Sequence, residues 1–342
     1  MEIKSSKVRL NNYDNLKGIA IITIIIIHMA FLTEYTSVST IKNMMFFIGL
    51  PIFFFISGYF SKIGPDEPIK AFKRLLIPYL LFCIIHFLFR IFILGDSSSK
   101  ILFFNPEVIL WFLISLFIMK LILPIVDKLK YPLIISIILS LLIGFTDINS
   151  SWMGITRVFT YLPLFLLGFY YKDYKFKLEN KNNNILKRIL KIWNNKKVLI
   201  CSLIIVLVMI GISSYLLPKG IIQMKYPYSS PKLVEMIERL IVILLGIGIT
   251  LVLHKLVPNK ETFLTKIGRN SMTVYLLHIY ITEIIKKFVK HYDLFKGQPY
   301  LFLIFVLITA FTLAFILSRD PITKYLNKFT DGIYNLITNP YK

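Results

Sequence analysis

The sequence predicts an all-α fold, a polytopic bundle of about ten transmembrane helices with both ends of the chain in the cytoplasm. Hydrophobic residues make up 56% of the 342 residues and charged residues only 17%. The mean hydropathy of +0.70 is well above that of an ordinary soluble domain. Apolar stretches of about 20 residues, the length that a helix needs to cross a bilayer, recur along nearly the whole chain. We therefore expect a single membrane domain over residues 1–342, with no appended soluble domain.

Ten apolar stretches account for the predicted spans, and proline or glycine marks many of their ends. The first stretch follows a basic segment, as the core of a signal peptide would. No small-residue cleavage site comes after it, so we interpret it as a permanent span. The predicted spans are residues 16–34, 44–61, 75–94, 108–125, 131–146, 157–172, 198–217, 237–256, 271–289 and 300–318.

The net charge of +22 points to a membrane surface and not to nucleic acid, because the basic residues cluster between the hydrophobic spans. With the N-terminus inside, 28 of the 40 Lys and Arg residues lie in or beside cytoplasmic segments and 11 in or beside external ones. The positive-inside rule therefore places both termini in the cytoplasm. The abundance of Ile, Lys and Asn is typical of AT-rich bacterial genomes, so the bacterial cytoplasmic membrane is the expected location.

The predicted cytoplasmic loop 173–197 is rich in Lys and Arg and allows two interpretations. It could form a basic amphipathic helix on the inner leaflet, or it could be a solvated linker between two helical halves. The first interpretation rests on apolar residues at helical spacing, namely Ile185, Leu186, Ile189, Leu190 and Trp193.

The first span carries polar residues, which are costly inside a membrane and so call for an explanation. Lys17 and His28 are eleven residues apart, which is about three helical turns, so they share one face and lie roughly 16 Å apart. Asp14 lies one turn before Lys17 on the same face. An imidazole can take a proton near neutral pH, which suits a general base acting on a hydroxyl. A histidine that bonds to a neighbouring backbone carbonyl is an equally good explanation of this helix alone.

The stretch from Asp14 to Gly18, followed by an apolar run and His28, resembles the opening of the acyltransferase-3 family of membrane acyltransferases. It looks closest to the branch known as fucose 4-O-acetylase-like. That family usually has Arg, ten residues and then His, whereas this chain has Lys17 in place of the Arg. Further matches follow in the family's order between about residues 9 and 318, at Pro51–Tyr59, Lys73–Tyr79, Leu110–Leu113, Tyr161–Gly168 and Asn270–His278.

The resemblance implies transfer of an acyl group, commonly acetyl from acetyl-CoA, to a glycan hydroxyl, with acyl-CoA as donor substrate and no permanently bound cofactor. The simplest mechanism is direct attack by the acceptor hydroxyl, with His28 as base and Asp14 or another acid as its orienter or charge partner. Lys17, Lys73 and Arg74 suit the phosphates of CoA. The positive-inside rule explains Lys73 and Arg74 equally well.

Candidate acceptor-binding residues lie at the predicted external ends of the fourth and sixth spans. Glu107 and Arg157 could contact a sugar, and Trp111 and Tyr161, one turn after each, could stack on it. Solvated surface charges and an interfacial aromatic belt explain the same residues. His278 lies about 11 Å into the ninth span, where it either approaches His28 in depth or packs as a structural histidine.

No His, Cys, Asp and Glu spacing in the sequence matches a known metal site, so we expect no metal. A secondary transporter or glycan exporter without acyl chemistry is the alternative function, since buried polar residues would suit it too. A scaffold subunit of a glycan-assembly complex is a third. The expected partners are the lipid bilayer, acyl-CoA, a glycan or lipid-linked sugar, and glycan-assembly proteins that complete the transfer.

Overall fold

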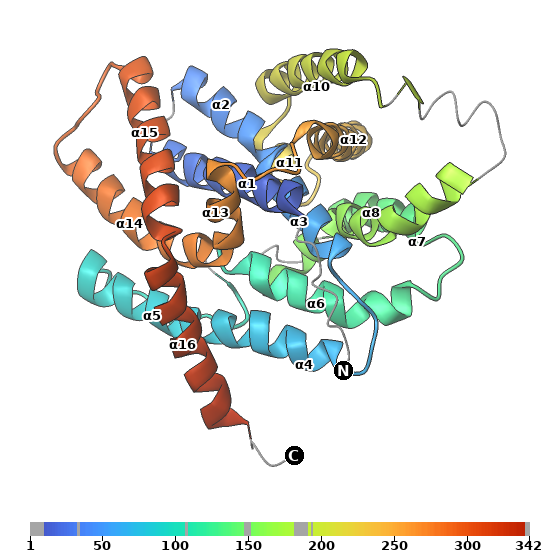
Figure 1. Ribbon diagram of the computed structural model, residues 1–342. Helices are drawn as coiled ribbons and strands as arrows, with labels where there is room; N and C mark the ends of the chain where they lie inside the picture. The colour runs from blue at the N-terminus through green and yellow to red at the C-terminus, as the bar shows by residue number, and fades with distance from the viewer. Residues whose placement is uncertain are drawn as a thin grey trace.

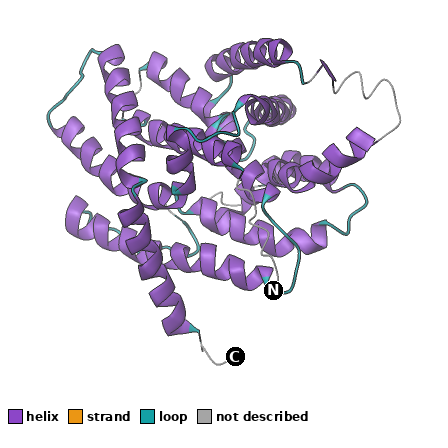
Figure 2. Cartoon of the chain, viewed as in Figure 1, coloured by secondary structure: helices purple, strands orange, loops and turns teal. Residues whose placement is uncertain are grey.

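The computed structural model describes residues 10–32, 35–106, 109–146, 152–180, 191–192 and 194–338, without the side chains of residues 174–180. All regular structure within these residues is helical (Figure 2). The α-helices are α1 (Asn11–Ala30), α2 (Thr36–Phe46), α3 (Gly49–Tyr59), α4 (Glu67–Ala71), α5 (Ile77–Phe89), α6 (Trp111–Val126), α7 (Pro132–Leu142), α8 (Ile155–Asn180), α10 (Lys196–Leu216), α11 (Lys219–Ile222), α12 (Lys232–Leu256), α13 (Phe263–Arg269), α14 (Ser271–His291), α15 (Pro299–Leu317) and α16 (Asp320–Ile337).

Short turns of other helical types join or extend these helices. Wide π-turns connect α4 to α5 and extend α5, and tight 3₁₀ turns follow α7 and precede α8. Their bounds are Phe72–Leu76, Arg90–Leu94, Ile143–Phe145 and Trp152–Gly154.

Within the described residues, seven helical segments are long and apolar enough to cross a membrane, and two further apolar helices are shorter. The outer surface is apolar as well: on α10, Ile204, Ile205 and Val208 are each more than half exposed. Such a surface would be unfavourable in water but suits contact with lipid. The chain is therefore an all-helical membrane protein. The seven qualifying segments are Asn11–Ala30, Thr36–Tyr59, Glu67–Leu94, Trp152–Asp173, Lys196–Leu216, Lys232–Leu256 and Pro299–Leu317, and the shorter ones are Trp111–Val126 and Pro132–Phe145.

Helix α1 lies in the middle of the bundle, in contact with α2, α3, α12, α13, α14 and α15 (Figure 1). It is apolar nearly all round, which is the pattern of a helix surrounded by protein. Every residue from Ala20 to Ile27 is buried. A polar side chain on this helix therefore has to find its partners in neighbouring helices.

Two glycines let α3 and α8 approach closely. A Cβ on Gly58 would lie 1.8 Å from the carbonyl oxygen of Phe165, and one on Gly168 would lie 1.9 Å from that of Phe55. Both clashes are with backbone, which cannot turn aside as a flexible side chain can. Small residues at such crossings are typical of helices that pack within membranes.

The predicted spans each coincide with a helix, and the structure adds detail that hydropathy did not indicate. The second span is broken at Phe47 and Ile48, between α2 and α3. Helix α14 is 21 residues long but carries Glu283, Lys286, Lys287 and Lys290, so it is not among the seven apolar segments. The count of ten spans and the cytoplasmic position of the termini stay predictions.

Four helices were not predicted: α13, α16 and the short α4 and α11. The amphipathic helix, one of two interpretations of the basic loop, falls on residues outside those that the structure describes. Helix α13 forms in the expected loop after residue 256, and α16 forms after the last span, where it contacts α5 and α14 and projects from the bundle (Figure 1). In the basic loop, α8 continues to Asn180. The five apolar residues on which the amphipathic interpretation rests lie outside the described residues.

We predict that Gly168→Ala will destabilise the folded protein by about 1–3 kcal/mol, the typical cost of overpacking a tight interface, because its methyl group would collide with the backbone of α3. Gly211→Ala is the matched control, since a Cβ there meets nothing within 4 Å. Thermal unfolding of the purified full-length protein in detergent measures both. Equal midpoints for the two variants would contradict the close crossing.

Candidate active site

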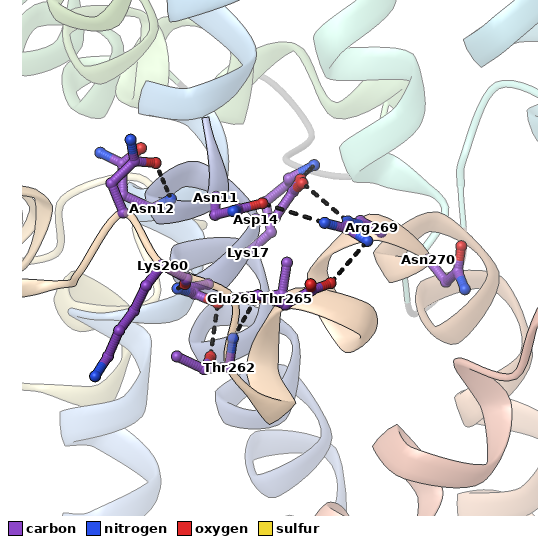
Figure 3. A network of polar contacts seen from close by, with 12 residues as sticks. Asn11, Asn12, Asp14, Lys17, Lys260, Glu261, Thr262, Thr265, Arg269 and Asn270 are labelled. Atoms are coloured by element: carbon purple, nitrogen blue, oxygen red, sulfur yellow. Dashed lines mark hydrogen bonds and ion pairs between the residues drawn. The ribbon is translucent and has the colours of Figure 1, made fainter. Parts of the chain in front are cut away.

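Charged side chains form a network at the N-terminal end of α1, where α13 packs against it (Figure 3). Asp14 is only 4% exposed. Its carboxylate lies 2.7 Å from Nζ of Lys17 and 3.7 Å from Nε of Arg269. Arg269 also forms an ion pair with Glu261 at 3.0 Å. Two cations thus neutralise Asp14, which offsets the cost of burying a carboxylate.

Asn15 completes the joint between α1 and α13. Its side-chain amide donates to the backbone carbonyls of Pro258 and Lys260, both at 3.0 Å. Its side-chain oxygen accepts from the hydroxyls of Thr262 at 2.7 Å and Thr265 at 2.6 Å. With both donors and its acceptor satisfied, this buried amide holds α13 in place against α1.

The network separates Asp14 from His28. The two are fourteen positions apart on α1, which is about 21 Å along the helix axis. Asp14 and His28 are therefore not in contact, as their spacing in the sequence implied, and a catalytic role for Asp14 stays a prediction. Lys17, the expected donor-binding cation, is 23% exposed and paired with Asp14.

Two histidines meet in the apolar interior at the other end of α1. The ring centroids of His28 and His278 are 5.3 Å apart. His278, on α14, is fully buried, and His28 is partly buried. Nδ1 of His278 lies 3.0 Å from the carbonyl oxygen of Val274, and a carbonyl can only accept, so the proton of the neutral ring is on Nδ1.

This tautomer gives Nε2 of His278 a lone pair that can accept a proton. Among the described residues, Nε2 has no hydrogen-bond partner. A buried polar atom without a partner is costly in a membrane protein, and such atoms are enriched where function requires them. The two imidazoles thus form the best candidate for acid–base chemistry in the described part of the chain.

An arginine and two aromatic residues lie close to the histidine pair. The guanidinium of Arg157 stacks over the Trp111 ring at 3.9 Å, and Trp111 stacks with Tyr161 at 6.2 Å between centroids. Three of the four predicted acceptor-binding residues therefore lie together. The fourth, Glu107, lies outside the described residues.

Tyr275 connects this aromatic group to the histidines. Its ring lies 6.3 Å from that of His278, and its hydroxyl donates to the carbonyl of Ile109, two residues before Trp111. The positive charges of Arg157 and Lys286 act electrostatically on His28. The imidazole pair therefore adjoins an arginine on an aromatic surface.

The remaining predicted donor-binding cations lie at the start of the third predicted span. Lys73 forms an ion pair with Asp331 of α16 at 2.9 Å and lies 4.6 Å from the Tyr334 ring, while Arg74 is exposed. Lys120, from the middle of apolar helix α6, joins them: it is partly buried, donates to the Ser61 hydroxyl at 2.8 Å and interacts electrostatically with Arg74.

Sequence reasoning missed three cations, Lys120, Arg239 and Arg269. Lys120 and Arg239 stand inside the predicted spans 108–125 and 237–256, and a charge inside a span is itself a signal of function. Arg269 gave no such signal, because only the packing of α13 on α1 brings it to Asp14. Among the described residues, no group of three or more His, Cys, Asp or Glu side chains is placed to bind a metal ion.

The fold and the site define a polytopic membrane protein with a histidine pair in its apolar interior. The acyltransferase-3 family model, described as an acyltransferase domain, matches residues 10–319. The chain therefore belongs to the acyltransferase-3 family, and this membership supports an acyltransferase activity in the membrane. No curated protein and no solved structure matches the chain significantly.

We predict that Asp14→Asn will destabilise the protein by about 3 kcal/mol, because it leaves Lys17 and Arg269 side by side without the buried carboxylate. Adding Lys17→Met should recover part of that loss, since the double variant removes one of the two unneutralised cations. Thermal unfolding of wild type, both single variants and the double variant in detergent gives the coupling free energy between Asp14 and Lys17. The control is the exposed pair Lys70–Glu67, at 2.8 Å, whose loss should have little effect. Additive effects of Asp14→Asn and Lys17→Met would contradict the pairing.

Proposed function

We propose that this chain is an O-acyltransferase that transfers an acyl group, acetyl from acetyl-CoA, to a hydroxyl of a cell-surface or exported glycan in the bacterial cytoplasmic membrane. The observation that carries the proposal is the pair His28 and His278, next to Arg157 and Trp111, in a chain of an acyltransferase family. An imidazole with a free lone pair is what a hydroxyl nucleophile requires.

In the proposed reaction, a nitrogen of the histidine pair removes the proton of the acceptor hydroxyl. The hydroxyl oxygen attacks the thioester carbonyl, the carbon–sulfur bond breaks, and the thiolate of CoA leaves and takes up the proton. His28 is the better placed base because it is partly accessible, whereas His278 is fully buried. His278 then acts as hydrogen-bond partner of His28 or of the acceptor.

The donor is proposed to enter from the end of the bundle that carries Lys17, Lys73, Arg74 and Lys120. These cations suit the phosphates of CoA as point charges or, for arginine, as a bidentate donor. Lys17 to His28 is roughly 16 Å along the helix axis, so the flexible arm of CoA has to carry the thioester from the cations to the histidines.

The acceptor is proposed to enter from the opposite end, where the Arg157–Trp111–Tyr161 group lies. With both termini in the cytoplasm, this end faces outward, where glycans are displayed. The fucose 4-O-acetylase-like branch is the closest fit within the family by the motif around Lys17 and His28. Glycan-assembly proteins are the proposed partners of this chain.

We predict that His28→Ala will lower glycan acylation at least about 100-fold, the lower end of what a general base contributes, while leaving the protein inserted. His28→Gln should not rescue activity, because an amide can form hydrogen bonds but cannot take up the proton. Mass spectrometry of surface glycans measures acylation as the mass increment of an acetyl group. The amount of each variant in the membrane is measured in the same cells. His86→Gln is the control, a buried histidine on α5.

Near wild-type acylation by His28→Gln would reject His28 as the base and leave His278 as the candidate. Surface glycans with identical acyl content in cells with and without the gene would reject the proposed function. Intact acylation together with reduced glycan export in a deletion strain would favour the exporter.

The proposed orientation predicts that a cysteine at Ser98, in the loop before α6, is labelled from outside intact cells by a membrane-impermeant thiol reagent. A cysteine at Asn327, on α16, should be labelled only after the membrane is opened. Both variants need a background in which Cys83 and Cys201, the free cysteines, are replaced. The reverse labelling pattern would overturn the orientation.

A further inference from the structure

A second arginine lies near the candidate acceptor site. Arg239, on α12, is 0% exposed and is the largest fully buried side chain among the described residues. Its Nη2 donates to the backbone carbonyl of Tyr226 at 2.7 Å, and its guanidinium lies 4.4 Å from the centroid of the Tyr228 ring. Its Nε and Nη1 have no hydrogen-bond partner within the described part of the chain.

The nearest carboxylate does not satisfy Arg239. Glu235, one turn earlier on α12, interacts with it electrostatically. The Glu235 carboxylate instead accepts from the backbone nitrogen of Ser229 at 2.8 Å and from the Ser229 hydroxyl. A buried guanidinium with two unsatisfied nitrogens is a costly arrangement that packing alone would remove.

Arg157 shares this lack of an anionic partner. It is partly buried, stacks on Trp111, and forms no ion pair with the carboxylates that the structure describes. Tyr161 lies within electrostatic range of both arginines. Tyr226 joins them as well, because its carbonyl binds Arg239 and its side chain interacts electrostatically with Arg157.

We propose that Arg157 and Arg239 together bind an anionic group of the acceptor, a phosphate or a carboxylate close to the hydroxyl that is acylated. The proposal rests on the proposed function, since it assigns the anion to the acceptor. Guanidinium groups bind phosphate and carboxylate through paired, charge-assisted hydrogen bonds. A neutral glycan leaves both guanidinium groups without an anionic partner and is therefore a poor substrate.

The covering of the two arginines sets the order of binding. Arg157 is partly accessible, so the anion meets it first. Arg239 is fully buried and bonded to the backbone carbonyl of Tyr226, in the segment between α11 and α12. That segment therefore has to move before the anion reaches the two unpaired nitrogens of Arg239. The bound anion then lies beside the aromatic surface of Trp111 and Tyr161, on which a sugar ring can stack.

Anion binding is testable on the purified full-length protein in detergent without donor or acylation. The thermal midpoint is measured against inorganic phosphate, diphosphate, glucuronate and, as a neutral probe, glucose, with ionic strength held constant by chloride. Wild type should show a saturable rise in midpoint with at least one of the anions and none with glucose. Phosphate or diphosphate acting alone identifies a phosphorylated acceptor, and glucuronate acting alone identifies an acidic sugar.

Arg157→Gln and Arg239→Gln should each raise the anion concentration for half-maximal stabilisation about tenfold or more, because each removes a charge-assisted contact. Arg239→Lys should keep part of the response. Arg319→Gln is the control, an arginine that stacks on Phe315 away from this site. No anion response in wild type, or an unchanged response in Arg239→Gln and Arg157→Gln, overturns the proposal.

The midpoint without anion adds a second test. Arg239→Gln should unfold at the same or a higher temperature than wild type, because Gln keeps a donor for the Tyr226 carbonyl and removes an unpaired buried charge. A lower midpoint would make Arg239 a structural residue and overturn its assignment. If the wild-type protein does not respond to anions but acylates glycans in cells, only this inference is rejected. If it binds anions but acylates no glycan, only the proposed function is rejected.

Discussion

The absence of water inside the membrane is the constraint on which the rest of this structure depends, because every buried polar group must find its partner in the protein. The two ends of α1 meet this constraint differently. At the N-terminal end, Asp14 and Asn15 are matched by ion pairs and hydrogen bonds from α13 and the segment before it. At the other end, His278 and Arg239 keep polar atoms without partners in the described structure. A satisfied network serves the fold, and an unsatisfied one is available to a substrate.

Close helix packing is what brings these groups into range of one another. Gly18 and Gly268 allow α13 to touch the backbone of α1, because a Cβ at either position would collide with Leu264 or Asp14. Gly58 and Gly168 do the same for α3 and α8, the helix that presents Arg157 and Tyr161. The site therefore depends on glycines that lie away from its chemistry, and their replacement should affect both stability and activity.

Hydropathy and residue spacing predicted the all-helical class and a helix at each proposed span. The order of the motifs predicted the acyltransferase-3 family. The depth of His278 in its predicted span made an approach to His28 one of the two alternatives. Neither residue spacing nor motif order could show that Asp14 turns towards Arg269, 255 positions later in the sequence. Periodicity places a residue on a helix face but does not say which helix that face meets. Arg239 stands inside the predicted span 237–256, which is a signal of function, but only the structure shows that its guanidinium is fully buried with two nitrogens unbonded in the described part of the chain.

The apolar middle of α1 limits which parts of the two substrates can meet. Between Lys17 and His28 the helix is apolar except for Thr23, whose hydroxyl donates to the carbonyl of Ala20 at 2.7 Å. A phosphate has no partner along this stretch of α1, whereas a thioester is neutral and can enter. The charges of the donor would then stay with the lysines at one end and those of the acceptor with the arginines at the other. Only the neutral thioester and the neutral hydroxyl would reach the histidines, which is the pair of groups that the proposed reaction joins.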